Sequence, residues 1–112
     1  MTLFPCAKIN LGLNVVSKRD DGYHNLETVF YPIPLCDALE VTVMDSDFPS
    51  GFPCDLKITG NSIECNEQEN LVVKAYNILS KDFTLPRIHT HLHKQIPSQA
   101  GLGGGSSDAA YM

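Results

Sequence analysis

The sequence predicts an α+β fold, in which a mixed β-sheet carries helices on one face. Three observations lead to this prediction. Apolar and polar residues alternate in several segments between residues 6 and 65, which is the period of β-strands. The period becomes helical after Asn66, and a glycine-rich segment at residues 101–105 leads into a second helix start. At 112 residues, we expect one modest domain over residues 1–112 with a single core.

The first half of the chain is expected to be rich in strands. Residues 6–16 alternate, which predicts a strand with one buried face and places Lys8 and Asn10 on the same side. Residues 26–35 form a second strand, which its two prolines restrict to an edge or interrupt, and the polar turn between the two strands favours a hairpin. Further strands are expected at residues 38–44, 55–59 and 62–65.

The second half is expected to hold two helices and one more strand. A helix is predicted from Asn66 to about residue 82, with Asn66 and Glu69 as its capping residues. Its apolar stripe consists of Leu71, Val72, Ala75, Ile78 and Leu79. Residues 88–96 return to strand alternation, and a serine or the aspartate within residues 106–108 is expected to cap a helix that begins there.

Composition excludes several classes of protein. Thirteen acidic residues against eight basic ones give a net charge of −5, so a nucleic-acid backbone would find little opposite charge, and no nucleic-acid partner is expected. No apolar run approaches the roughly 20 residues of a membrane span.

The N-terminus lacks the pattern of a signal peptide, which favours a cytoplasmic location with reduced thiols. Free, partly buried thiols are preferred to a zinc site for Cys6, Cys36, Cys54 and Cys65.

Residues 97–110 (PSQAGLGGGSSDAA) place flexible backbone directly before a helix N-terminus. Unpaired N–H groups and the positive end of the helix dipole attract anions there, so phosphate is the expected ligand. Glycines let the main chain approach a phosphate, and the hydroxyls of Ser106 and Ser107 suit phosphate oxygens or Mg²⁺. The spacing differs from that of a Walker A loop and of a Rossmann fingerprint. The alternative is a flexible linker, which rarely lies between a strand and a capped helix.

The same segment resembles the second motif of the GHMP kinases, P-x-x-x-G-L-G-[GS]-S-[AS]-A. Residues 5–11 (PCAKINL) resemble the P-A-K-[IL]-N-L start of the diphosphocytidyl-methylerythritol kinases, and residues 19–24 (RDDGYH) resemble their R-x-D-G-Y-H turn. The three motifs occur in family order over almost all of the chain, and Cys6 is a mild departure. The resemblance implies the two-layer N-terminal domain of a GHMP kinase, incomplete here because the family enzymes are more than twice as long and have a C-terminal domain.

The activity implied by the resemblance is ATP-dependent phosphorylation of the 2-hydroxyl of 4-diphosphocytidyl-2-C-methyl-D-erythritol, in non-mevalonate isoprenoid biosynthesis, with Mg²⁺ present. Lys8 would be the catalytic lysine, whose ammonium stabilises the transferring phosphoryl or lowers the pKa of a nearby carboxylate. Without the motif, a solvated lysine is the alternative interpretation. Asn10 is implied to contact the substrate, and Tyr23 and His24 to hold its cytosine by stacking and by a hydrogen bond.

The resemblance also implies a set of ATP-binding residues. They are Asn70, Leu71, Lys94, Pro97, Gly101, Leu102, Gly103, Gly104, Gly105, Ser106 and Ser107. For the first three, the alternatives are a polar residue of the first helical turn, a core leucine and a surface lysine. In the family, an aspartate of a G-A-D-[VI]-P-F-type motif takes the hydroxyl proton. That motif matches nowhere in these 112 residues, so the chain alone is expected to be inactive, and a nucleotide-binding module without catalysis is the alternative function.

Three features leave alternatives open. His89, His91 and His93 alternate, so three imidazoles share one face of a strand, a geometry that can hold Zn²⁺. A solvent-exposed face is preferred to a metal site, because no fourth ligand follows by pattern. Asp108 either favours the helix dipole or reaches Mg²⁺ through water. A homodimer also remains open, because nothing in the sequence decides the oligomeric state.

Overall fold

The computed structural model describes residues 1–45, 47–49, 51–61, 67–98 and 101–112. Its main sheet has four strands in the order β1-β4-β6-β5, and two longer strands form a separate antiparallel ribbon. The strands of the main sheet are β1 (Thr2–Leu3), β4 (Ala38–Val43), β5 (Cys54–Gly60) and β6 (Ile88–Lys94). The ribbon consists of β2 (Cys6–Lys18) and β3 (His24–Cys36). The helices are the short 3-10 helix η1 (Glu67–Glu69), α1 (Leu71–Ser80) and α2 (Gly104–Tyr111).

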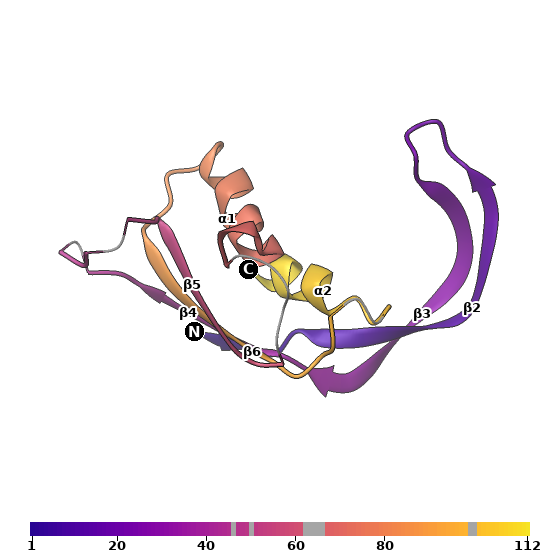
Figure 1. Ribbon diagram of the computed structural model, residues 1–112, viewed down its shortest axis with the longest axis horizontal. Helices are drawn as coiled ribbons and strands as arrows, with labels where there is room; N and C mark the ends of the chain where they lie inside the picture. The colour runs from indigo at the N-terminus through magenta and orange to yellow at the C-terminus, as the bar shows by residue number, and fades with distance from the viewer. Residues whose placement is uncertain (46, 50, 62–66, 99–100) are drawn as a thin grey trace.

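The main sheet is mixed and has its helices on one side. β4 runs antiparallel to β6, whereas β5 and β6 are parallel and α1 lies in the connection between them. Both helices lie against the same face of the sheet, next to each other (Figure 1). The predicted α+β class, with a mixed sheet and helices on one face, is therefore confirmed.

The hydrophobic core lies between this sheet and α1. Its buried residues from the sheet and from α1 are Leu39, Cys54, Leu56, Ile88, Leu92, Val72, Val73 and Tyr76. In β6 the alternation works as predicted, because Thr90 and Leu92 face the helices while the histidines face the other way. The hydroxyl of Tyr76 donates to the carbonyl oxygen of Pro86 at 2.9 Å, so the polar end of this aromatic side chain has a partner.

The predicted apolar stripe of α1 is partly wrong. Leu71, Ile78 and Leu79 are exposed, and the buried face is centred instead on Val72, Val73 and Tyr76. Helical periodicity allows more than one apolar stripe on this sequence, and contact with the sheet selects one of them. The helix also begins later than predicted, because the side chain of Asn70 caps it. The predicted cap Asn66 and the predicted strand at residues 62–65 lie outside the described residues.

The two-stranded ribbon, which we call the β2–β3 arm, projects from the main sheet (Figure 1). The predicted hairpin is confirmed, and the two prolines lie in β3 of a two-stranded ribbon, where an edge position is available. The prediction that one face of residues 6–16 is buried is wrong beyond Asn10. Leu11, Leu13 and Val15 are all more than half exposed. Among the described residues, nothing packs over this part of the arm.

The described cysteines are not all free thiols. Cys6 and Cys36 lie opposite each other in the register of β2 and β3, with Cα atoms 4.1 Å apart, and are joined as a disulfide. The prediction of reduced thiols is therefore wrong for these two residues, because only the hairpin register brings together two positions separated by 30 residues. Cys54 is a buried free thiol, as predicted, and Cys65 lies outside the described residues.

In the described part of the chain, no helix has the length and apolar character needed to cross a membrane.

Candidate functional site

The glycine-rich segment ends at the first turn of α2. Gly103 is the N-cap residue, with φ of 70°, a left-handed conformation that glycine adopts without strain. The prediction of a serine or aspartate cap is wrong, because no side chain caps this helix among the described residues. The backbone N–H of Ser107 donates to the carbonyl oxygen of Gly103 at 2.9 Å and closes the first turn. The N–H groups of Gly104, Gly105 and Ser106 come before that bond, where an anion finds unpaired donors.

Lys8 is held directly against this segment. Its backbone N–H donates to the carbonyl oxygen of Leu102 at 2.9 Å, and its Nζ donates to the carbonyl oxygen of Gly101 at 2.7 Å. The ammonium also lies 5.5 Å from the ring centroid of Phe30, within the range of a cation–π contact. A Cβ on Gly103 would lie 3.0 Å from Cε of Lys8, so it would displace this flexible side chain slightly, while the positive φ of Gly103 is the stronger reason for glycine at this position. The fold thus brings Lys8 into contact with Gly101, which is 93 residues later in the sequence.

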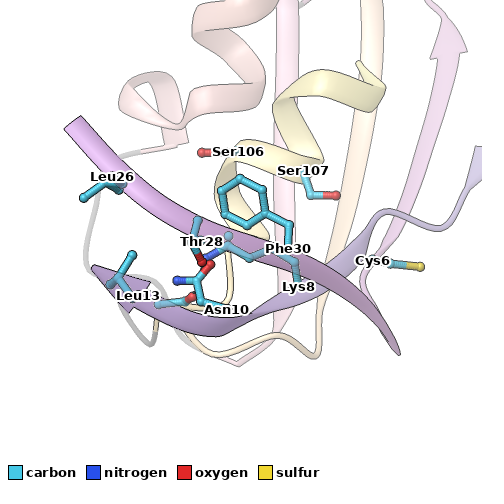
Figure 2. Close-up of a pocket in the computed structure, with 11 residues that line it drawn as sticks. Cys6, Lys8, Asn10, Leu13, Leu26, Thr28, Phe30, Ser106 and Ser107 are labelled. Carbon is cyan, nitrogen blue, oxygen red and sulfur yellow. Dashed lines mark hydrogen bonds between the residues drawn. The ribbon is translucent and has the colours of Figure 1, made fainter. Parts of the chain in front are cut away.

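Lys8 opens onto a cavity of about 680 Å³ between the base of the β2–β3 arm and the start of α2 (Figure 2). The residues that line it are Cys6, Lys8, Asn10, Leu13, Leu26, Thr28, Phe30, Gly101, Gly103, Ser106 and Ser107. Oδ1 of Asn10 is buried and has no hydrogen-bond partner among the described residues. The cavity therefore combines an ammonium, three hydroxyls and an unused acceptor with apolar walls, which is the usual composition of a small-molecule site.

A second cavity, of about 150 Å³, lies beside the other flank of α2. Its lining includes Asn70, Leu71, Lys94 and Gly105, which the sequence assigned to ATP binding. The oxygen Oδ1 of Asn70 accepts from the N–H of Val72 at 2.9 Å, so this side chain caps α1. Leu71 is exposed, and a Cβ on Gly105 would lie 3.4 Å from its Cδ1. Eight of the predicted ATP-binding residues therefore divide between two cavities on either side of one helical turn. Pro97, Leu102 and Gly104 are not among the described residues that line either cavity.

Lys94 is buried, with 3% of its surface exposed, and is not the surface lysine of the alternative interpretation. Its ammonium pairs with the carboxylate of Asp37 and, at 2.9 Å, with Oδ2 of Asp108. The other oxygen of Asp37 accepts from the backbone N–H groups of Gln95 and Ile96 at 2.7 and 2.9 Å. The sequence analysis did not select Asp37, although an acidic residue between apolar neighbours was an available signal.

The three charged groups affect one another's pKa values. Burial raises the pKa of Asp108 to about 7, and the hydrogen bond that it shares with Asp37 acts in the same direction. Burial would also raise the pKa of Asp37, but hydrogen bonds from Asp108, from two backbone N–H groups and from Lys94 lower it below its ordinary value. Burial alone would lower the pKa of Lys94, and its bonds to both carboxylates raise it. The cluster therefore keeps Lys94 charged and Asp37 ionised.

Tyr23 and His24 lie at the far end of the β2–β3 arm (Figure 1). Tyr23 is 72% exposed, and its backbone N–H donates to Oδ1 of Asp21 at 3.1 Å within the turn. Neither residue is among the described residues that line the cavity at Lys8. The described structure therefore does not bring the two residues assigned to cytosine together with Lys8 and Asn10.

The three alternating histidines lie on the face of the sheet opposite the helices. Their rings contact residues of β5. Oγ1 of Thr59 lies 2.8 Å from Nε2 of His91 and 2.9 Å from Nδ1 of His93. His89 lies 3.6 Å from the carboxylate of Asp55. His91 and His93 are exposed, as the preferred interpretation expected. No group of three potential metal ligands is found in the described ranges of the chain.

Comparison with known proteins identifies the relatives of this chain. The family described as "GHMP kinases N terminal domain" matches residues 70–112. A 4-diphosphocytidyl-2-C-methyl-D-erythritol kinase of Bacteroides fragilis is 58% identical over 112 residues, which are 100% of this chain and 40% of the relative. The kinase of the same name from Cytophaga hutchinsonii is 52% identical over 112 residues, covering 99% of this chain and 38% of the relative.

A solved structure agrees with these sequence relatives. The crystal structure of a 4-(cytidine 5'-diphospho)-2C-methyl-D-erythritol kinase superposes with a TM-score of 0.72 at 37% identity, covering 99% of this chain and 37% of that chain. The chain thus spans about 40% of the length of the curated relatives that it matches. Sequence, fold and the glycine-rich motif therefore agree: residues 70–112 match the N-terminal domain of the GHMP kinases, and the whole chain is similar to the N-terminal part of the diphosphocytidyl-methylerythritol kinases.

Proposed function

We propose that the full-length protein transfers the γ-phosphoryl group of ATP to the 2-hydroxyl of 4-diphosphocytidyl-2-C-methyl-D-erythritol. Residues 1–112 form its N-terminal domain for ATP and substrate, and a second domain completes it. The names of the relatives support this reaction. The observation that carries the proposal is the contact of Lys8 with the carbonyl oxygen of Gly101, which places a fixed ammonium at the start of α2 beside a cavity of about 680 Å³.

Lys8 and the first turn of α2 together suit phosphoryl transfer, a reaction in which the protein acts chiefly through positioning and charge. The unpaired N–H groups of the first turn of α2 bind phosphate oxygens. Lys8 lies on a strand and is held by its backbone bond to Leu102, so its ammonium stabilises the charge on the transferring phosphoryl without reorganising. The hydroxyls of Ser106 and Ser107 would be oxygen ligands for Mg²⁺ in this cavity, and the ion would supply charge neutralisation on the phosphates.

The remaining assignments follow from the two cavities and the arm. We place the adenine beside Asn70 and Leu71, whose cavity adjoins the same first turn of α2. Asn10 binds the acceptor part of the substrate, since its free Oδ1 can accept from a hydroxyl. Tyr23 and His24 hold the cytosine, and a substrate with a diphosphate between its two ends suits contacts that lie apart. The protein acts in the cytoplasm, where ATP is available.

The test is phosphoryl transfer from labelled ATP by the full-length protein. Replacing the fixed charge in Lys8→Met should lower kcat about 10²–10³-fold, the usual cost of one charge-stabilising donor. Lys57→Met is the matched control, because Lys57 is exposed on the other face of the sheet and should leave kcat unchanged. ATP binding without turnover by the wild-type protein would instead support a nucleotide-binding module, and stoichiometric zinc in the purified protein would support a metal-binding role for the histidines.

The assigned domain division has its own test. The 112-residue chain, assayed beside the full-length protein, should show no turnover, because it holds no match to the motif that carries the family's proton acceptor. Loss of a general base costs about 10²–10⁴-fold in rate. Turnover by the shorter chain within tenfold of the full-length rate would contradict both the assigned proton acceptor and the proposed second domain.

A further inference from the structure

We infer that Asp37, Lys94 and Asp108 form a buried triad that positions the glycine-rich segment against Lys8, and that Lys94 acts through this triad and not as a ligand of ATP. The inference rests on the proposed function, since ATP is the ligand whose affinity the triad sets. It changes the assignment of Lys94 from a binding residue to a positioning residue.

The triad joins three segments that are distant in sequence. Asp37 lies between β3 and β4, Lys94 ends β6, and Asp108 lies in α2. Each of the three residues is at most 3% exposed, and the ammonium bonds to a carboxylate oxygen of each aspartate. A buried charge is tolerated only when it is paired, so each member requires the other two in place. Movement of any of these segments would break a buried ion pair.

One side of the triad fixes the strand that carries Lys8. The backbone N–H of Asp37 donates to the carbonyl oxygen of Pro5 at 2.9 Å, immediately before β2 begins. The carboxylate of the same residue accepts from the backbone N–H groups of Gln95 and Ile96, just after β6 ends. Asp37 therefore ties the start of the strand bearing Lys8 to the start of the segment that leads to α2.

The other side of the triad fixes α2. Gly104 and Asp108 are one helical turn apart and are the two buried residues of this helix. A Cβ on Gly104 would lie 2.7 Å from Cγ2 of Ile96 and 3.2 Å from Nζ of Lys94. The first turn of α2, which supplies the free N–H groups, therefore rests directly on the ammonium of Lys94. The position of the anion-binding turn relative to Lys8 follows from this contact.

The surroundings of Lys94 argue against a direct contact with ATP. Two carboxylates already occupy its ammonium, which is closed to solvent, and the adjoining cavity measures only about 150 Å³. With Lys94 charged and Asp37 ionised, the triad is neutral when Asp108 is protonated and carries one net negative charge when Asp108 is ionised, so in either state it has no excess positive charge to offer a phosphate. Oδ1 of Asp108 is buried without a hydrogen-bond partner among the described residues, which makes this carboxylate especially dependent on Lys94.

The experiment measures the Kd of ATP by calorimetry for variants of the full-length protein. Lys94→Met and Asp108→Ala should each weaken ATP binding about tenfold or more, since misplaced binding groups are costly. Asp108→Asn keeps the shape and should stay within about threefold of the wild type, which is a rescue by the conservative variant. The double variant Lys94→Met/Asp108→Asn should bind ATP better than Lys94→Met alone, because it removes one of two carboxylates left facing each other. Lys57→Met, on the exposed sheet face, is the control.

The outcomes separate positioning from direct binding. If Lys94→Met weakens ATP binding while both Asp108 variants match the wild type and the double variant regains nothing, Lys94 is an ATP ligand and the inference is overturned. If Lys94→Met fails to fold, the two Asp108 variants test the inference by themselves. The inference is then overturned if Asp108→Ala and Asp108→Asn both bind ATP as tightly as the wild type. A wild-type protein that binds no ATP overturns the proposed function and this inference together, whereas equal affinities across the variants of an ATP-binding protein overturn the inference only.

Discussion

β6 and β2 have the same alternating sequence pattern but opposite environments. In β6 every second side chain is buried, and Leu92 is 0% exposed. In β2 the alternating Leu13 is 56% exposed. β6 lies inside the main sheet between β4 and β5 and under the helices, whereas β2 pairs with β3 alone among the described strands. The comparison shows that alternation identifies a strand, while burial depends on which element packs on it.

The candidate site lies where these two regions meet. The buried region positions the first turn of α2, because Asp108 and Gly104 of this helix lie against Lys94 at the end of β6. The β2–β3 arm supplies Lys8 and Asn10 at its base and leaves apolar side chains beyond them exposed. Stability and binding should therefore depend on different regions, and substitutions in each region test this contrast.

The largest effect is expected in the core. Leu92→Ala should lower the free energy of unfolding by about 2–5 kcal/mol, because the removed side chain leaves a cavity between the sheet and α1. Leu13→Ala in the exposed arm should lower it by less than about 1 kcal/mol. Chemical denaturation of both variants measures the difference. Similar losses would mean that the arm is as well packed as the core.

The next effect concerns two neighbouring glycines of α2. Gly104→Ala should destabilise the protein by about 1–3 kcal/mol, because its Cβ would lie 2.7 Å from Cγ2 of Ile96. Gly105→Ala should be neutral or slightly stabilising, since only the flexible Cδ1 of Leu71 lies within reach, at 3.4 Å, and alanine favours a helix. Thermal unfolding distinguishes the two variants. Equal melting temperatures would contradict the tight contact of α2 with Ile96.

A smaller effect should appear in the pH dependence of stability. Asp108 has a pKa of about 7 in the folded protein and about 3.9 when unfolded, so the folded state binds more protons between these values. Its contribution to stability is complete below about pH 4 and is lost as the pH rises through about 7, at about 1 kcal/mol for each pH unit. The groups facing it are Asp37 and Lys94, with Glu69 at the edge of the second cavity.

Asp108→Asn should therefore flatten the fall in stability between about pH 5 and pH 7 in urea unfolding measured at several pH values. Asp37 does not act in this window, because its lowered pKa affects stability only at lower pH, where protonation removes its contribution. A wild-type protein whose stability is constant across the same window would contradict the burial of an ionisable Asp108.

The smallest effect is expected at the end of the arm. Tyr23→Ala should raise the KM for the diphosphocytidyl substrate about fivefold in the full-length protein, since lost stacking is worth about 1 kcal/mol. The Kd of ATP and the melting temperature should not change, because Tyr23 is 72% exposed. Tyr23→Phe should be milder. Parallel losses of ATP and substrate affinity would indicate a folding defect and remove Tyr23 from the cytosine site.

Several elements were predicted from the sequence because they depend on near neighbours. The hairpin of β2 and β3, strands β4, β5 and β6, and the glycine-rich entry into α2 were expected close to where they lie. Alternation, turn residues and glycines at positive φ are local features that the sequence displays directly. The motif resemblance also grouped Lys8 with the glycine-rich segment, which the structure places around one cavity.

The remaining features were decided by tertiary contacts. Periodicity did not identify the buried face of α1, and spacing did not pair Cys6 with Cys36. The sequence context of Lys94 allowed an ATP ligand or a surface lysine, and only the packing of Asp37, 57 residues away, and of Asp108 around it decided its contacts. Burial, pairing and a shifted pKa depend on which distant segments pack together, and neighbouring residues in the sequence do not carry that information. The sequence by itself predicted the strands, the glycine-rich entry into α2 and the resemblance to the diphosphocytidyl-methylerythritol kinases, while the tertiary structure decided which charges are buried and what Lys94 contacts.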